Sequence, residues 1–133
     1  MGFKDAAEVR KYLGGVFETA FADPEVGPKL RATGIVLKTV YSDPEATLVI
    51  DTTSGSVREA QPDDEASAEM SMTADTGNAY WQGKVNLPLA MAKSRIKVTG
   101  NVASLLKLAP LGKKLYPAYI ETLTADGRDD LLV

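Results

Sequence analysis

A nine-residue run near the middle of the chain alternates strictly between apolar and polar side chains. Its apolar set is Ala66, Ala68, Met70, Met72 and Ala74, and its polar set is Ser67, Glu69, Ser71 and Thr73. Because successive side chains of a strand point to opposite faces, this period of two predicts a strand with one buried face and one solvated face. The chain must therefore build a sheet, and other elements must cover the apolar face of that sheet.

The residues on either side of this run predict further strands. Residues 35–41 and 47–52 are rich in β-formers and are joined by a polar turn, and a third short strand is expected at 56–61. These three segments predict an antiparallel meander. Residues 95–99 alternate again and predict one more strand, so that five are expected in total.

Apolar residues spaced three and four apart predict helices before the meander. The first helix is expected from Asp5 to Phe21, and Asp5 followed by Glu8 is typical of an N-terminal capping arrangement. The sequence around Asp23 resembles a second cap and predicts a short helix that ends at Gly34.

Prolines divide the second half of the chain into short helices. A helix through Trp81 is followed by an apolar helical segment at 85–92. After the last strand, Asn101 is expected to cap a helix that Pro110 ends, because proline lacks the N–H that a helix interior needs. A final apolar stripe restarts or kinks at Pro117.

Composition excludes most familiar enzyme chemistries. The 133 residues suit one domain over 1–133, and the chain contains neither histidine nor cysteine. Thiol nucleophiles, disulfides, the usual zinc sites and histidine bases are therefore excluded, and we expect no catalytic residue, metal or cofactor. The acidic run at 63–65 is interpreted as a solvated turn. No secretory signal or bilayer-spanning stretch is visible, so we expect a cytoplasmic protein.

Charge is distributed unevenly along the chain. Residues 43–75 contain nine acids and one base, whereas residues 84–120 contain seven bases and no acid. The two segments are interpreted either as neighbouring surfaces that offset each other or as a basic face for anionic lipid. The second interpretation assigns a membrane contact to Lys93, Lys107, Lys113 and Lys114. Nucleic acid is not expected as a partner, because the net charge is −3 and few aromatics accompany the bases.

Three spaced motifs in the second half resemble a known family. Gly83-Lys84-Val85-Asn86 is followed, after eight residues, by the run from Arg95 to Asn101, and then by Leu105-Leu106-Lys107-Leu108. This pattern is similar to that of the sterol carrier protein 2 family of lipid-binding domains. The chain departs from the family where Gly77 and Asn78 replace large apolar residues, Ser94 replaces glycine and Thr99 replaces lysine.

The resemblance implies an α+β fold. Its sheet would be five-stranded, twisted and mainly antiparallel, with helices covering one side and an apolar tunnel enclosed. Such domains bind a sterol, a fatty acid or an acyl-CoA, so the resemblance implies noncatalytic carriage by a monomer or homodimer. A C16 chain buries about sixteen methylenes, which yields roughly 13 kcal/mol at ~0.8 kcal/mol each, so binding needs no polar motif.

Candidate ligand-contacting residues are the apolar side chains that would surround such a tunnel. They are Met70, Met72, Trp81, Leu87, Leu89, Met91, Leu105, Leu106, Leu108, Tyr116, Tyr119, Ile120 and Leu123. Each of them is equally suited to ordinary core packing. Two alternative functions remain open: proton transfer on a steroid- or polyketide-like substrate by a buried acid or tyrosine, and dimerisation through the same apolar groove.

Overall fold

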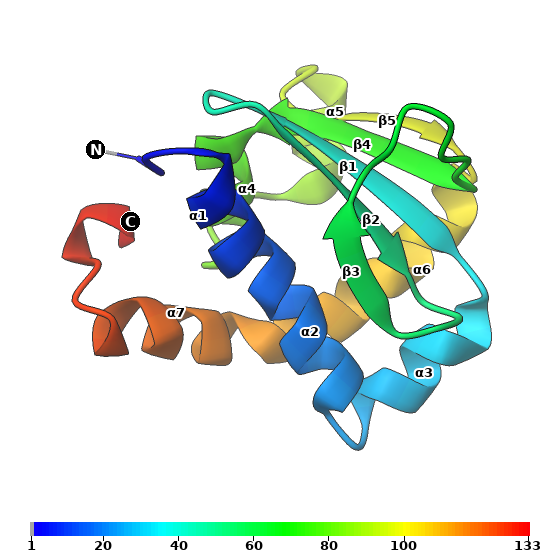
Figure 1. Cartoon of the computed structure of the whole chain (residues 1–133), viewed down its shortest axis with the longest axis horizontal. Coiled ribbons are helices and arrows are strands. Elements are labelled where there is room, and N and C mark those ends of the chain that lie inside the picture. The colour runs from blue at the N-terminus through cyan, green and yellow to red at the C-terminus, as the bar shows by residue number, and fades with distance from the viewer. Residues whose placement is uncertain (1) are drawn as a thin grey trace.

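The structure, a computed structural model that describes residues 2–133, is built on one five-stranded sheet, and Met1 lies outside the described residues. The strands are β1 (Val36–Ser42), β2 (Ala46–Asp51), β3 (Ser56–Glu59), β4 (Ala68–Thr73) and β5 (Lys97–Gly100). Their order across the sheet is β3-β2-β1-β4-β5, and β1 and β4 are the parallel pair (Figure 1). The expected meander and the mainly antiparallel sheet are confirmed.

The register places one side chain of each central strand on a shared face. Thr39 of β1 lies opposite Leu48 of β2 and Met70 of β4. In β4 the predicted alternation is confirmed, because Met70 and Met72 are buried while Ser71 between them is partly exposed. The sheet therefore turns one apolar face toward the helices.

The N-terminal helix is continuous but changes its winding. It consists of α1 (Ala6–Val9), a π-helical turn η1 (Arg10–Gly14) and α2 (Gly15–Ala22), followed by α3 (Val26–Thr33). Asp5 caps the first turn as predicted, since Glu8 N donates to Asp5 Oδ1 at 3.0 Å. Asp23 stabilises the turn that leads into α3, with Val26 N donating to Asp23 Oδ1 at 2.9 Å.

The second half contains four helices with short 3₁₀ turns. They are α4 (Ala74–Tyr80), α5 (Leu87–Ala92), α6 (Val102–Gly112) and α7 (Tyr116–Ala125), with turns η2 (Lys113–Leu115) and η3 (Asp129–Leu131). Asn101 caps α6 as predicted, because Ser104 N donates to Asn101 Oδ1. The prediction that Pro110 ends this helix is wrong: α6 continues to Gly112 with the proline inside it. The missing N–H of Pro110 leaves the carbonyl of Leu106 without its helical partner, and Leu106 is exposed on the surface of the helix, where water is at hand.

The helices form a layer against one face of the sheet. Figure 1 shows α2, α3 and α6 on the same side, with α7 running back from α6 toward the two chain ends. The buried core joins side chains of this layer, such as Leu13 and Leu123, to Leu48 and Ile50 of the sheet. Within residues 2–133, no helix is both long enough and apolar enough to cross a bilayer.

Candidate functional site

An apolar cavity of about 70 Å³ lies between the sheet and the helical layer. Its floor is the helix-facing side of the three central strands: Leu37, Thr39 and Tyr41 of β1, Ile50 of β2, and Met70 and Met72 of β4. The register places Thr39 beside Met70 and Tyr41 beside Met72. Because side chains alternate along β1 and β4, these neighbouring residues all lie on the cavity floor.

Helices α2 and α3 form one wall of this cavity. The wall contains Phe17 and Phe21 from α2, and Val26 and Leu30 from α3. Phe17 packs edge-on against Trp81, with ring centroids 5.4 Å apart. This contact ties the N-terminal helix to the segment that follows α4.

Helix α6 covers the cavity incompletely. Leu105 is buried, but Leu108, Ala109 and Leu111 are half-buried although they line the cavity. Apart from Ser104 and Lys107, every residue of α6 is apolar or glycine, so the helix lacks the polar outer face usual for a surface helix.

The end of α6 packs tightly against the indole of Trp81. A Cβ atom at Gly112 would lie 3.2 Å from Trp81 Cζ3, so glycine permits this close approach. Tyr80 and Tyr116 complete an aromatic cluster here, and the Trp81 and Tyr116 ring centroids are 6.2 Å apart. Burial raises the pKa of Tyr80 and of Tyr116, so both hydroxyls stay protonated near neutral pH.

The lining residues carry no formal charge. Among the residues that the structure describes, no Asp, Glu, Lys or Arg lines the cavity, and its polar groups are hydroxyls, an indole and backbone atoms. Such a site suits burial of an apolar ligand, because an unpaired charge in it would be costly.

The space that the structure shows here is narrow. Its volume of about 70 Å³ is smaller than that of a cavity of about 150 Å³ that accommodates benzene. A long acyl chain or a sterol therefore requires the lining to move apart. Helix α6 is partly exposed, so it loses less buried surface than the other lining elements if it moves to admit a ligand.

A family model of the SCP-2 sterol transfer family matches residues 16–113, which run from α2 to η2 and include all but one of the cavity-lining residues. The chain belongs to this family. The sole lining residue beyond the match is Leu115. The resemblance of the motifs at 83–86 and 95–101 is thereby confirmed.

Solved structures of SCP-2 domains share this fold. The sterol carrier protein domain 2 of Helicoverpa armigera is 20% identical, with a TM-score of 0.68 over 82% of this chain and 88% of that chain. Sterol carrier protein 2 from Aedes aegypti, in complex with the C16 fatty acid palmitate, is 24% identical, with a TM-score of 0.57 over 85% and 97%.

An enzyme also contains a similar unit. The stereoselective inverting sec-alkylsulfatase of a Pseudomonas species is 20% identical, with a TM-score of 0.52 over 64% of this chain and 14% of that chain. The SCP-2 fold therefore occurs both alone and as a small part of a larger chain. A search of curated proteins finds no match to the sequence.

The structure brings together part of the predicted ligand-contacting set. The cavity of this SCP-2 domain is lined by Met70, Met72, Trp81, Leu87, Leu105 and Leu108. The others lie elsewhere: Leu89, Leu106 and Ile120 are exposed, Met91 and Tyr116 are half-buried, and Tyr119 and Leu123 are buried outside the cavity lining.

The wall from α2 and α3 was not foreseen from the sequence. Phe17 was expected only within the apolar spacing of the first helix, and none of Phe17, Phe21, Val26 and Leu30 was among the candidate ligand-contacting residues. A stripe that packs a core and a stripe that lines a cavity have the same spacing. No sequence signal in these residues distinguishes the two.

Asn78, one of the positions where the chain departs from the family pattern, makes hydrogen bonds to the C-terminal part of the chain. Asn78 is buried, and its Nδ2 donates to the carbonyl of Leu131 at 2.7 Å while its Oδ1 accepts from Tyr119 OH at 2.7 Å. Gln82 Nε2 donates to the same Leu131 carbonyl at 2.8 Å. The polar side chains therefore hold the C-terminal segment against α4.

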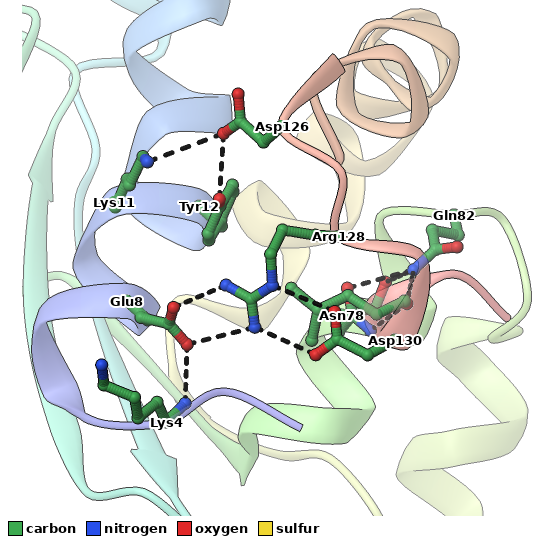
Figure 2. A network of polar contacts seen from close by, with 10 residues as sticks. Lys4, Glu8, Lys11, Tyr12, Asn78, Gln82, Asp126, Arg128 and Asp130 are labelled. Carbon is green, nitrogen blue, oxygen red and sulfur yellow. Dashed lines mark hydrogen bonds and ion pairs between the residues drawn. The ribbon is translucent and has the colours of Figure 1, made fainter. Parts of the chain in front are cut away.

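Arg128 anchors the same segment to the first helix. Its guanidinium donates to Glu8 and to Asp130, with Arg128 Nε 3.0 Å from Asp130 Oδ1 (Figure 2). Tyr12 OH donates to Asp126 Oδ2 at 2.9 Å beside this pair. Hydrogen bonds from Arg128 lower the pKa of Glu8 and of Asp130, which favours the ionised form of both carboxyl groups.

The acidic and basic segments do not pair with each other directly. Within residues 2–133, no ion pair joins a residue of 43–75 to a residue of 84–120. The two segments are neighbours in the sheet, because β4 pairs with β5, but direct ion pairing between them is not confirmed. Lys114 instead pairs with Glu25 at the start of α3.

Proposed function

We propose that this SCP-2 domain binds a hydrophobic lipid, such as a sterol, a fatty acid or an acyl-CoA, and carries it without altering it chemically. The observation that supports this function is an uncharged cavity between sheet and helices, within the segment that matches the family. The palmitate complex of the Aedes aegypti relative supports the same class of ligand.

The energetics of burial are sufficient for such binding. About sixteen buried methylenes contribute roughly 13 kcal/mol, against association costs of ~4 to 15 kcal/mol. Part of this energy is spent on opening the cavity, and α6 is the element that we expect to move. Leu106 is exposed and Leu108 is half-buried, so both are already in contact with water. Moving α6 away from the sheet therefore costs little hydrophobic burial at these two residues.

Carriage is favoured over proton transfer by the chemistry of the lining. A general base needs a carboxylate, imidazole or amine within reach of substrate, and none of the lining residues supplies one. Burial raises the pKa of Tyr41 to about 12, so its hydroxyl is a poor proton acceptor near neutral pH. The second candidate function is a role for this domain as part of a larger enzyme, because the sec-alkylsulfatase contains a similar unit.

We further propose that the domain meets an anionic membrane through α6 and its neighbours. Leu106 and Lys107 are exposed on α6, Lys113 is exposed just after it, and Lys93 is exposed at the end of α5. Lys114 contributes less free charge because Glu25 pairs with it. Cytoplasmic localisation remains a prediction.

Native mass spectrometry of protein purified without detergent tests lipid binding. We expect a co-purifying lipid, and saturable displacement of a fluorescent fatty acid by palmitate or a sterol. Absence of bound lipid, together with failure to bind either fluorescent fatty acid or fluorescent sterol, would overturn the proposal. Light scattering on lipid-free protein addresses dimerisation, because a dimer that lipid does not dissociate would favour a protein-binding groove.

A further inference from the structure

The floor of the cavity contains a buried hydroxyl group without a hydrogen-bonding partner. The side chain of Thr39 is on the central strand β1 and is 1% exposed. Its Oγ1 is the one buried side-chain polar atom, among residues 2–133, that makes no hydrogen bond. Buried hydroxyls are normally paired, since leaving one unpaired costs free energy.

Thr52 provides the comparison within the same cavity. It is also a buried threonine of the lining, but its Oγ1 donates to the carbonyl of Ile35 at 2.6 Å. The unpaired state of Thr39 is therefore not a general property of threonines on this sheet face. It marks one position on the cavity floor.

A second hydroxyl lies near Thr39. Tyr41 is two residues along β1 and lines the same face of the cavity, and its interaction with the Thr39 hydroxyl slightly opposes the effect of burial on the Tyr41 pKa. Burial raises the pKa of Tyr41 to about 12, so this group remains a neutral donor. The floor thus offers two neutral hydroxyls within an apolar lining.

The chemistry of this floor discriminates between polar groups. An ionised carboxylate has no cationic partner among the lining residues, so its burial at this end would be costly. A ligand hydroxyl is neutral, and it can accept one hydrogen bond and donate another. It matches the two hydroxyls of the floor without introducing a charge.

We propose that Thr39 and Tyr41 bind the hydroxyl group of a neutral hydrophobic alcohol, a long-chain alcohol or a sterol, that enters the cavity hydroxyl first. This inference rests on the proposed lipid binding and specifies its ligand class and orientation. A fatty acid binds in the opposite direction, with its carboxylate outside the cavity and its methyl end against the floor.

Thr39→Val tests the inference, because valine has nearly the shape of threonine and lacks the hydroxyl. Affinities of 1-hexadecanol and of palmitate are measured by displacement of a fluorescent fatty acid. We expect Thr39→Val to weaken 1-hexadecanol binding about tenfold, the loss of one good hydrogen bond, and not to weaken palmitate binding, because the methyl end of palmitate makes no hydrogen bond to the floor. Thr52→Val, the matched control, should leave the ratio of the two affinities unchanged.

Thermal unfolding without ligand gives a second readout. Thr39→Val should raise the melting temperature, since it removes an unpaired buried hydroxyl, whereas Thr52→Val should lower it by removing a hydrogen bond. If Thr39→Val leaves the ratio of the two affinities unchanged, this inference is overturned while the proposed lipid binding stands. Failure of the unmodified protein to bind either ligand overturns the proposed function as well.

Discussion

Gly77 of α4 lies directly against the ring of Tyr41 on the cavity floor. A Cβ atom at position 77 would approach Tyr41 Cε1 to 2.9 Å and Leu13 Cδ1 to 3.1 Å. The absence of a side chain at 77 therefore determines where the Tyr41 ring sits.

Gly77→Ala is expected to destabilise the fold by overpacking. The cost should be about 1–3 kcal/mol, because the ring and Leu13 belong to a close-packed core that yields little. Chemical denaturation at equilibrium measures it. Gly15→Ala is the control, since a Cβ at Gly15 would meet no atom within 4 Å. A Gly77→Ala variant as stable as the Gly15→Ala variant would contradict the close contact.

The strands and their polar turns were predictable because a sheet with one buried face imposes a period of two. The alternation around Met70 and Met72 indicated both the strand and its inner face, and both residues line the cavity. The cap at Asp5 was predictable for a similar local reason, since an aspartate oxygen satisfies the free N–H of Glu8.

The features that were not predictable depend on tertiary packing. The spacing of Phe17 and Phe21 shows which side of α2 is buried but not whether that side meets atoms or empty space. The unpaired state of Thr39 depends on the absence of a partner from other elements, which no local pattern encodes. Pro110 was read as a helix end because its ring disfavours a helix interior, yet α6 continues for two residues beyond it.

Ala109→Phe is expected to reduce lipid binding by filling the cavity. Ala109 lines the cavity from α6, and a phenyl group there occupies space that a ligand needs. Affinity for a fluorescent fatty acid should fall severalfold, as measured by titration. Ala103→Phe is the matched control, because Ala103 is exposed on the same helix. Equal effects of the two substitutions would place the ligand outside this cavity.

Acid should weaken the attachment of the C-terminal segment through Glu8 and Asp130. Arg128 lowers the pKa of both carboxyls in the folded state, from ordinary values of 4.5 and 3.8. Their contribution to stability is therefore present above those ordinary values and is lost as pH falls through the lowered folded values. The stability difference between wild type and Arg128→Gln should be largest at neutral pH and should shrink progressively in acid.

Melting temperatures of wild type and Arg128→Gln across this pH range provide the measurement. Arg31→Gln is the control, since Arg31 is exposed and forms no ion pair within residues 2–133. It removes the same charge without touching Glu8 or Asp130. A constant difference between Arg128→Gln and wild type from neutral pH to strong acid would rule out this ionic contribution.

Membrane contact through α6 predicts a charge-dependent binding to vesicles. Leu106 and Lys107 are exposed on α6 and Lys113 is exposed just after it, and each lysine near an anionic surface contributes about 1 kcal/mol. The double substitution Lys107→Gln and Lys113→Gln should therefore weaken binding to phosphatidylserine-containing vesicles by roughly thirtyfold, as measured by co-sedimentation. Higher salt should reproduce the loss in wild type, because salt screens exposed charges.

The same net charge can be removed far from α6 as a control. Lys4 and Lys11 are exposed near the N-terminus. Figure 1 shows the first helix and α6 in different parts of the molecule. The double substitution Lys4→Gln and Lys11→Gln should leave vesicle binding within about twofold of wild type if position, rather than net charge, determines contact. Leu106→Ser should add to the loss by removing the apolar side chain that enters the interface. Equal losses from the two lysine pairs would mean that α6 is not the membrane-facing surface.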